Sequence, residues 1–366
     1  MILPTTSQLG HFSRRINQLF NTPQVAIIGG YHGINVGDLA LGYAVKNILN
    51  QRQISSGLQT IYNLEKWDWP FAEKAVIGGG AVGYNNLVEV IAKRYQDYPQ
   101  NVAFLGVDFN DQYYSERSLE FLKKVRWISC RSKDQELKLE VMTGRKDIFS
   151  HPDIAFSLPL QSDPSTPSSQ SSKILLLNAV PLYGKIEKDR IVPLAQYASE
   201  RPDLYRNWDK IQNGYAELIR YTVDQYLSQG YSVESLPFTP MDQAAAGIIL
   251  KGLRVCHHAY YPNPYKIIEI VKNVNSFFAT RYHATIFGLK ANLKMIPFAY
   301  AKKNEQLMND LEIHTSSYFK PLDFSEGYSP DRQLIPVSYN HDIVKQLQLA
   351  ATQTINDCIN HLLNDK

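Results

Sequence analysis

Short apolar runs alternate with amphipathic stretches along most of the chain, in the rhythm of an α/β protein. The run Val25–Ile28 is strand-like, and apolar residues recur at helical spacing from about 38 to 52, with Asp38 as the expected N-cap. The first half therefore predicts a layered α/β domain. Its further predicted strands are 74–77, 102–107, 127–130 and 154–156, with helices at roughly 85–95, 115–125 and 133–142.

A segment rich in Ser and Pro and free of apolar residues, 162–172, interrupts this rhythm. Such a composition is typical of a linker, so we expect an N-terminal domain over 1–161 and a C-terminal domain over 173–366. The alternation then resumes, with strands expected at 173–180, 231–238 and 253–257, a helix near 206–228 and another that opens at Asp242. A final helix of about 343–363 carries an apolar stripe, and we expect it to return to the first domain.

The segment from Ser276 to Lys290 carries the sharpest functional signal. Phe277, Phe278 and Ala279 read as a buried strand, and Arg281 and His283 follow where a helix should begin. In α/β units, ligands bind beyond the carboxyl ends of strands, where a helix N-terminus offers N–H groups and partial positive charge. An anionic substrate that also needs a proton donor fits this pair. The alternative is a structural salt bridge and a helix-capping histidine.

Composition and charge exclude several classes of protein. The 366 residues carry a net charge of +3 with dispersed Lys and Arg, which argues against a nucleic-acid partner. The cysteines Cys130, Cys256 and Cys358 are far apart and form no CxxC, so neither a disulfide framework nor a thiolate zinc site is indicated. No signal-peptide pattern and no apolar run of membrane-spanning length is present, which predicts a cytoplasmic protein.

Other candidate motifs carry less weight. The turns Gly29–Gly33 and Gly78–Gly83 lack the full dinucleotide or P-loop spacing, although either could bring backbone N–H groups close to a ligand or serve only as a tight turn. Neighbouring residues of a strand point to opposite faces, so Cys256, His257 and His258 do not predict a shared metal. Asp153 and Asp242 are candidate carboxylates by residue type alone, and no GxSxG elbow indicates a serine hydrolase.

Several landmarks, in order, resemble the polysaccharide pyruvyl transferase family from about Val25 to Ile313. The most specific is Arg281-Tyr282-His283, which is similar to the family's Arg-Leu-His motif. The other landmarks are the glycine-asparagine-x-glycine-aspartate turn at Gly33–Asp38, the triple glycine at Gly78–Gly80, Cys130-Arg131-Ser132 in place of Val-Arg-Asp, the Pro-Asp-x-Ala-Phe segment at Pro152–Phe156, and the tyrosine-x-x-lysine segment with Tyr300 and Lys303.

This resemblance implies a GT-B-like architecture, in which two Rossmann-like domains face a cleft. It further implies that a pyruvyl group moves from phosphoenolpyruvate onto sugar hydroxyls as a ketal, with no cofactor and no metal. Arg281 would bind the donor and His283 would act in acid–base chemistry. The other residues expected to bind substrate are Asn35, Gly37, Asp38, Gly79, Gly80, Arg131, Lys185, Tyr300 and Lys303.

The acceptor implied by the resemblance is a saccharide precursor of a cell-wall polymer or exopolysaccharide, either lipid-linked or nucleotide-linked. A lipid-linked acceptor would place the protein peripherally at the inner face of the membrane. The sequence departs from the family pattern at Ser132 and at Ala301-Lys302, and Lys185 stands near the position of an arginine in many relatives. Two alternatives stay open: a GT-B glycosyltransferase that uses a nucleotide sugar, and a non-catalytic saccharide-binding relative.

Overall fold

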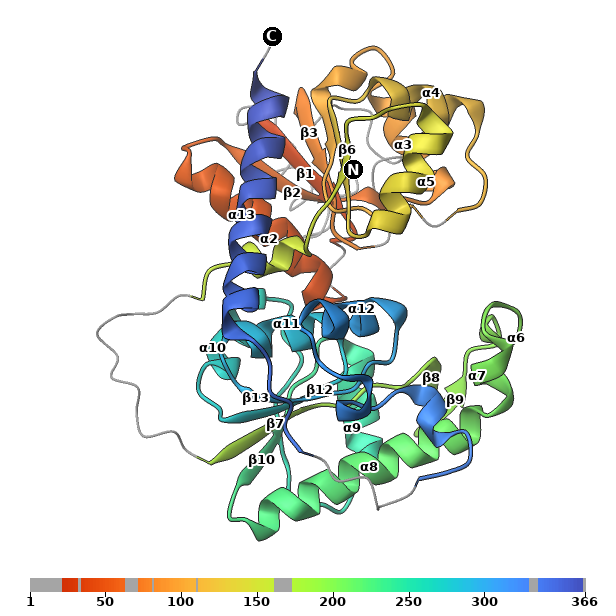
Figure 1. The fold of residues 1–366 in the computed structure, drawn as a ribbon, viewed down its shortest axis with the longest axis vertical. Helices are drawn as coiled ribbons and strands as arrows, with labels where there is room; N and C mark the ends of the chain where they lie inside the picture. Colours follow the sequence, from red (N-terminus) through yellow and green to blue (C-terminus); the bar gives the residue numbers. More distant parts are fainter. Residues whose placement is uncertain are drawn as a thin grey trace, which may run out of the picture. The chain divides into compact units, whose positions relative to one another are not determined.

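The computed structural model describes residues 22–31, 34–62, 72–80, 82–109, 111–160, 173–328 and 335–364. They form two compact units, whose elements are labelled in Figure 1. The first unit comprises the described residues within 1–32, 38–158 and 350–366, and the second those within 33–37 and 159–349. The linker predicted at 162–172 and the glycine Gly33 lie outside the described residues.

The first unit is built around a parallel six-stranded sheet with the strand order β2-β1-β3-β4-β5-β6. A crossover between parallel strands needs a connection of a dozen or more residues, and α2, α3, α4 and α5 lie in the connections that follow β1, β3, β4 and β5. The elements are β1 (Val25–Gly29), α2 (Val36–Gln51), β2 (Ser56–Thr60), β3 (Lys74–Ile77), α3 (Asn85–Arg94), η2 (Pro99–Asn101), β4 (Val102–Phe104), α4 (Glu116–Lys124), β5 (Trp127–Cys130), α5 (Lys133–Thr143), β6 (Ile148–Ser150) and η3 (Ile154–Ser157).

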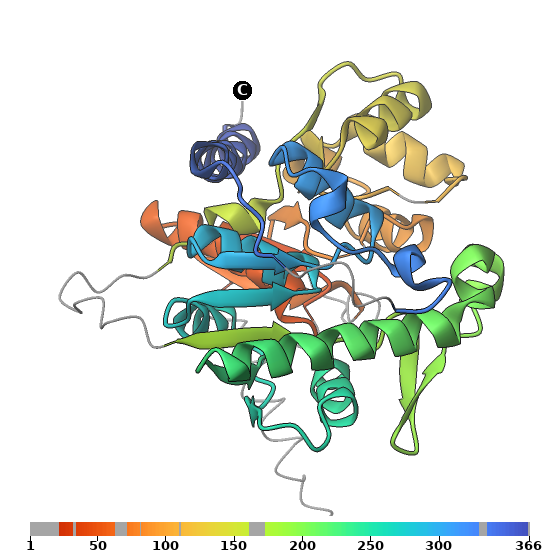
Figure 2. The same ribbon diagram turned by 60° about the horizontal axis from the view of Figure 1, so that its bottom comes forward.

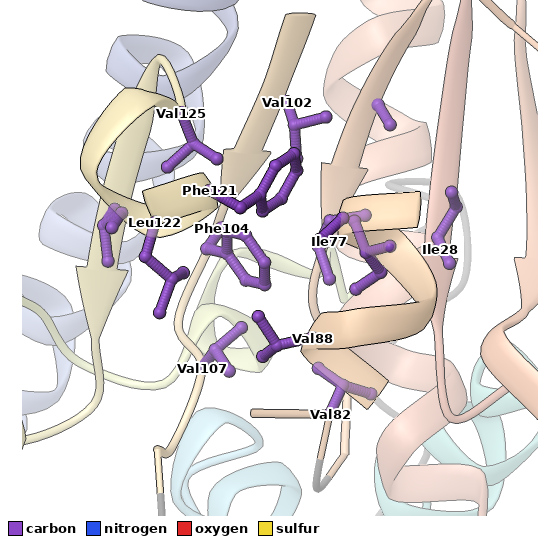
Figure 3. Close-up of a cluster of buried hydrophobic side chains, with 14 of the residues drawn as sticks. Ile28, Ile77, Val82, Val88, Val102, Phe104, Val107, Phe121, Leu122 and Val125 are labelled. Carbon is purple, nitrogen blue, oxygen red and sulfur yellow. The ribbon is translucent and has the colours of Figure 1, made fainter. Parts of the chain in front are cut away.

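Apolar side chains of β1, β3 to β6 and α3 to α5 pack into a hydrophobic core. Figure 3 shows Ile77 and Phe104 of the sheet together with Val88 of α3 and Phe121 of α4. The three residues Ile77, Val88 and Phe104 are fully buried. Strands buried on both faces read as continuous apolar runs, which is why the sequence pattern locates β1 and β3 well.

The second unit contains a parallel five-stranded sheet with the order β11-β10-β7-β12-β13 and a separate antiparallel hairpin, β8–β9. Figure 2 shows this hairpin projecting near one end of the long helix α8. The elements are β7 (Ile174–Asn178), β8 (Gly184–Glu187), β9 (Arg190–Pro193), α6 (Tyr197–Glu200), α7 (Pro202–Arg206), α8 (Trp208–Ser228), β10 (Ser232–Ser235), α9 (Pro240–Ile249), β11 (Cys256–His257), α10 (Pro264–Val271), β12 (Ser276–Ala279), α11 (Tyr282–Lys290), β13 (Lys294–Pro297), α12 (Lys302–Asp310), η4 (Thr315–Ser317), η5 (Pro321–Phe324) and α13 (His341–Leu363).

Strand β12 lies in the interior of this sheet, between β7 and β13. Its side chains, like those of β7, are almost entirely buried, and both strands contribute to the second core. Because the strands are parallel, the residues that follow β7, β10 and β12 all leave the sheet at the same edge. This edge carries Arg281 and His283.

The C-terminal part of α13 belongs to the first unit. The Arg52 guanidinium donates to the Asn360 side chain at 2.7 Å, and the Lys74 ammonium donates to the Leu363 carbonyl at 3.5 Å. The His361 and Trp127 rings lie 4.8 Å apart. The return of this helix to the first unit agrees with the sequence expectation. The described residues divide differently from the expected domains, because residues 350–364 lie with the first unit and residues 34–37 with the second.

Two local predictions were wrong for reasons of capping. The segment expected as a strand at 154–156 is the 3-10 helix η3, because the Asp153 carboxylate accepts a hydrogen bond from the Ala155 N–H at 2.9 Å and turns the chain. Asp38 is not the N-cap of α2, which already begins at Val36. The preceding residue Asn35 instead accepts from the Gly37 N–H at 3.0 Å.

Within the described residues, no helix combines the length and the apolar character that crossing a lipid bilayer requires.

Burial strongly affects the ammonium group of Lys290 in the second unit. Lys290, the last residue of α11, is 9% exposed, and burial lowers the pKa of its ammonium group to about 7. In the unfolded chain the group keeps its ordinary pKa of 10.5, so between these two values the unfolded state binds more protons than the folded state. Burial of the charged ammonium group of Lys290 therefore opposes folding, with its full effect below pH 7. This effect declines as the pH rises and the folded protein's lysine becomes neutral.

We expect Lys290→Met to raise the free energy of unfolding at neutral pH by an amount on the order of several kcal/mol. The advantage over the parent should shrink steadily toward alkaline pH, because the parent's lysine is then neutral in both states. Urea unfolding of both proteins across this pH range measures the difference. Lys294→Met, at an exposed position, is the control and should show no such trend. A pH-independent difference for Lys290→Met would contradict the expectation.

Candidate functional site

The candidate site of the second unit begins where β12 ends and α11 starts. Arg281 is the N-cap residue of α11, with an extended backbone, so its side chain leaves the chain beside the first turn of the helix. The N–H of Arg281 donates to the Asn178 side chain at 2.8 Å, at the end of the neighbouring strand β7. The strand ends therefore fix the arginine backbone beside the helix N-terminus, a position that favours anions.

The Arg281 guanidinium forms a salt bridge with Asp242, which is fully buried. Its Nε lies 3.2 Å from both carboxylate oxygens, and its Nη2 lies 2.5 Å from Oδ1. Asp242 thus engages the Nε and Nη2 edge of the guanidinium, and the Nη1 edge is turned away from it. The arginine side chain stays 22% exposed, so one edge of a fixed, charged fork can still meet a ligand.

Asp242 is itself held rigidly by the start of α9. It forms a capping box with Thr239, in which the Asp242 N–H donates to the threonine hydroxyl at 3.1 Å. The Asp242 Oδ2 accepts from the N–H groups of Phe238 and Thr239, each at 3.1 Å. A carboxylate with these partners has a single orientation, and it transmits that orientation to Arg281.

The charge of Arg281 is secure. Burial alone would lower the pKa of the guanidinium, but the nearby Asp242 carboxylate and the Tyr300 side chain outweigh it and hold the pKa above its ordinary value. Tyr300 also hydrogen-bonds to Arg281. The structure therefore brings together Arg281 and Tyr300, two of the residues expected at the site.

His283 lies one turn into this arrangement, in the first turn of α11, and is 5% exposed. Its imidazole packs against the backbone of Gly37: a Cβ atom built on that glycine would lie 2.0 Å from His283 Nδ1. Gly37 in turn donates its N–H to the Asn35 side chain. The expected site residues Asn35, Gly37 and His283 thus meet in the second unit, although they are far apart in the sequence.

The lysines expected at the site have other partners. The Lys303 ammonium lies 5.0 Å from the centre of the Tyr282 ring, next to His283 in sequence, which is a cation–π contact at the edge of the site. Lys185 lies on the hairpin strand β8 and pairs with Glu187 at 2.6 Å. Both side chains of that pair are about half exposed, and the contacts of the described residues do not link Lys185 to Arg281.

The expected residues of the first unit gather at the carboxyl edge of its own sheet. Gly79 and Gly80 follow β3 with φ values of +80° and +79°, a conformation that glycine adopts without strain. The Gly30 N–H donates to the Gly79 carbonyl at 2.9 Å, and a Cβ built on Gly80 would lie 3.1 Å from the Asp38 carboxyl carbon. Asp38, Gly79 and Gly80 therefore form one compact turn region.

Arg131 follows β5 at the same edge and is bound by two acids. It pairs with Asp108 and lies 3.5 Å from Asp153, whose side chain is fully buried. Asp153 is also the cap of η3 described above. The arginine side chain is 14% exposed. Its guanidinium is held by acidic partners, as that of Arg281 is.

The departures from the family pattern have local consequences. Ser132 is the N-cap of α5 and accepts from the Gln135 N–H at 3.4 Å, so it performs the capping that an aspartate there would perform. Ala301 is the N-cap of α12 and supplies no side-chain hydrogen bond. The first substitution preserves the start of a helix, and the second weakens one.

A cavity of about 370 Å³ also lies in the second unit, beside the edge strand β13. Its lining combines apolar residues such as Ile296, Phe319 and Val337 with polar ones such as His314 and Ser338. Arg281 and His283 are not part of that lining.

Sequence reasoning missed the partners that orient Arg281. Asp242 was singled out only by residue type, and Asn178 and Thr239 were not singled out at all. One signal was available: all three lie at the end of a predicted strand or the start of the helix after it, the edge where parallel strands bring ligands. The hydrophobic pattern of the sequence does not reveal the strand order, which makes β7 and β12 neighbours.

Comparisons with known proteins agree with this picture. The family model described as polysaccharide pyruvyl transferase matches residues 35–302. A search of the curated proteins found no match.

Among solved structures, the chain is similar to MnaA of S. aureus in a co-structure with UDP, with 11% identity, a TM-score of 0.50, and 93% of this chain and 97% of that chain covered. It also matches a UDP-GlcNAc 2-epimerase from Neisseria meningitidis (8% identity, TM-score 0.47, 88% and 97% covered) and the ADP-heptose lps heptosyltransferase II of E. coli (12%, 0.38, 92% and 98%). The fold is GT-B-like, with two Rossmann-like units.

We expect Asp242→Asn to lower the free energy of unfolding by about 3–5 kcal/mol, because it removes the counterion of a largely buried guanidinium while leaving the side chain's size unchanged. Urea unfolding measures the loss. Glu269→Gln, which breaks the exposed pair with Lys266, is the matched control and should change stability by less than about 0.5 kcal/mol. Equal effects of the two substitutions would contradict the role given to Asp242.

Proposed function

The chain belongs to the polysaccharide pyruvyl transferase family, and from this premise we propose that it transfers a pyruvyl group from phosphoenolpyruvate to two hydroxyls of a saccharide. The reaction forms a cyclic ketal and releases inorganic phosphate. The matched region, residues 35–302, contains Asn35, Gly37, Asp242, Arg281 and His283. A transferase acting on polysaccharides is what the family indicates, and the donor is our proposal.

The observation that carries the proposal is the oriented guanidinium of Arg281 at the N-terminus of α11. Phosphoenolpyruvate places a phosphate and a carboxylate in a small volume, so it needs a permanent positive charge with fork geometry. Asp242 engages the Nε and Nη2 edge of the guanidinium, and the Arg281 side chain stays 22% exposed, so an anion can approach it. The N-terminal turn of α11 adds partial positive charge at the same place.

His283 is proposed as the acid. Protonation of the methylene carbon of phosphoenolpyruvate turns its central carbon into a cationic centre, and a sugar hydroxyl then adds to that centre and loses its proton. Phosphate departs, and a second hydroxyl adds and loses its proton, so that two C–O bonds to sugar form and one C–O bond to phosphate breaks. A histidine titrates near neutral pH and can give and take these protons.

The proposed acceptor is a saccharide precursor of a cell-wall polymer or exopolysaccharide, linked to a lipid or a nucleotide. The reaction requires no cofactor or metal beyond the donor itself. We place it in the cytoplasm, and a lipid-linked acceptor would bring the protein to the inner face of the membrane.

A nucleotide-sugar reaction is the second candidate. Its support is that the MnaA structure of S. aureus, which shares the fold, was solved with UDP. At 11% identity this likeness shows the fold alone, and one fold hosts several chemistries. The oriented arginine fits either donor, so the choice depends on which donor reacts. A saccharide-binding protein without catalysis is the third candidate.

The test is to incubate the protein with phosphoenolpyruvate and a panel of lipid-linked, nucleotide-linked and polymeric glycans. We expect phosphate release together with a mass gain of one pyruvyl ketal on the acceptor. Parallel reactions with UDP-sugars in place of phosphoenolpyruvate should give no product. Turnover with UDP-sugars only would support the second candidate, and folded protein that turns over neither donor would support the third.

We expect His283→Gln to reduce turnover by about two to four orders of magnitude, because glutamine keeps hydrogen-bonding capacity but has no proton that titrates near neutral pH. Binding of phosphoenolpyruvate should survive, since Arg281 is unchanged. Steady-state kinetics and calorimetry measure the two effects. Near-normal turnover in His283→Gln would refute the acid–base assignment, whereas loss of donor binding would place His283 in the anion site instead.

A further inference from the structure

The contacts of the second unit close into a ring around the two central residues of the site. Gly37 packs on His283, which follows Arg281 by two residues on α11. Arg281 binds Asp242, which accepts a hydrogen bond from the Phe238 N–H. The Phe238 carbonyl accepts from the Val36 N–H at 3.0 Å, and Val36 precedes Gly37. Phe238 therefore contacts both arms of the ring, through its N–H on the Asp242 side and through its carbonyl on the Val36 side.

We infer that the Asn35–Gly37 turn is a positioning element for His283: it fixes the orientation of the imidazole and does not itself bind the donor. This inference rests on the proposed function, because it concerns the acid of that reaction. It gives the residues Asn35 and Gly37, expected from the sequence to bind substrate, a different role at the same site.

The space beside His283 leaves no room for a side chain at position 37. A Cβ at Gly37 would lie 2.0 Å from Nδ1, 2.6 Å from Cγ and 3.0 Å from Cβ of His283. These atoms belong to the rigid ring and its base rather than to the far end of a flexible chain. Any side chain at position 37 must therefore displace the imidazole or the backbone. Because Gly37 has no side chain, the backbone of the first turn of α2 packs directly against the His283 imidazole.

The backbone of the Asn35–Gly37 turn is itself held in place by hydrogen bonds. Asn35 accepts the Gly37 N–H at 3.0 Å, and Val36 is tied to Phe238 on the other side of the turn. Residues 33–37 accordingly belong to the second unit, although α2 continues with residues of the first. A fixed backbone contact matters for a catalytic acid, because displacing such a group by about 1 Å can lower the rate about a hundredfold.

The same residue, Phe238, also orients the charge that would bind the donor. Asp242 accepts from the Phe238 N–H while Arg281 donates to Asp242. Phe238 is therefore a common reference point for the position of the acid and the position of the charge. The two arms can nevertheless be separated by experiment, since Asp242 touches Arg281 and Gly37 touches His283.

The decisive variant is Gly37→Ala. We expect kcat to fall by about a hundredfold while KM for phosphoenolpyruvate stays within about twofold, because the acid moves and the anion site does not. Gly247→Ala is the matched control: that glycine is also helical, but a Cβ there meets nothing within 4 Å. A folded Gly37→Ala protein with unchanged kcat would overturn the inference.

A milder pair of variants guards against misfolding of Gly37→Ala. Asn35→Ala removes the acceptor of the Gly37 N–H and should lower kcat, whereas Asn35→Asp retains an acceptor oxygen and should restore it. If Asn35→Ala and Asn35→Asp behave alike, the turn does not position His283.

A readout without turnover separates this inference from the proposed function. The imidazole signal of His283, in protein labelled at histidine Cε1 and assigned by its loss in His283→Gln, should shift in Gly37→Ala and stay in place in Gly247→Ala. If the parent protein fails to transfer pyruvyl groups, the proposed function falls, yet a shifted signal still supports the positioning role. An unshifted signal in folded Gly37→Ala overturns it.

Discussion

The candidate site depends on one buried carboxylate. Asp242 is fully buried, accepts hydrogen bonds from the start of α9, and pairs with Arg281. Taking a carboxylate out of water is costly, and only this combination of backbone donors and a guanidinium compensates for it. The outcome is an arginine that has one orientation and is permanently charged. An arginine side chain surrounded by water would have no fixed orientation of its guanidinium.

Parallel sheet topology determines where this interaction can form. The ends of β7, β10 and β12 lie side by side, so Asn178, the capping box of α9 and Arg281 meet at one edge without any being close in sequence. The same edge of the first unit's sheet holds Gly79, Gly80 and Arg131, again oriented by acidic partners. In each unit, the candidate residues at the strand ends lie beside helix starts that supply partial positive charge, which is the arrangement in which α/β proteins bind ligands.

The salt bridge and the functional site are not competing explanations of Arg281. The sequence allowed either a structural pair or an anion-binding residue, and the structure contains the pair. Asp242 engages the Nε and Nη2 edge and orients the guanidinium, while the Arg281 side chain stays 22% exposed and can still meet a ligand. A similar relation holds at His283, where contact with Gly37 removes freedom from the ring without adding a competing charge.

Local patterns in the sequence predict the separate elements: the α/β alternation, the buried strand before Arg281, the helix that starts beside Arg281 and His283, and the long C-terminal helix. These follow from periodicity and from capping, which act over a few residues. Short edge strands such as β2 escaped because they are only half buried and carry little apolar pattern. The three-dimensional fold was needed to show that Asp242, 39 positions before Arg281, is its partner, and that Gly37 lies against His283. The physical reason is that these contacts depend on strand order and helix placement, which arise from packing of the whole unit and leave no periodic signal in the chain.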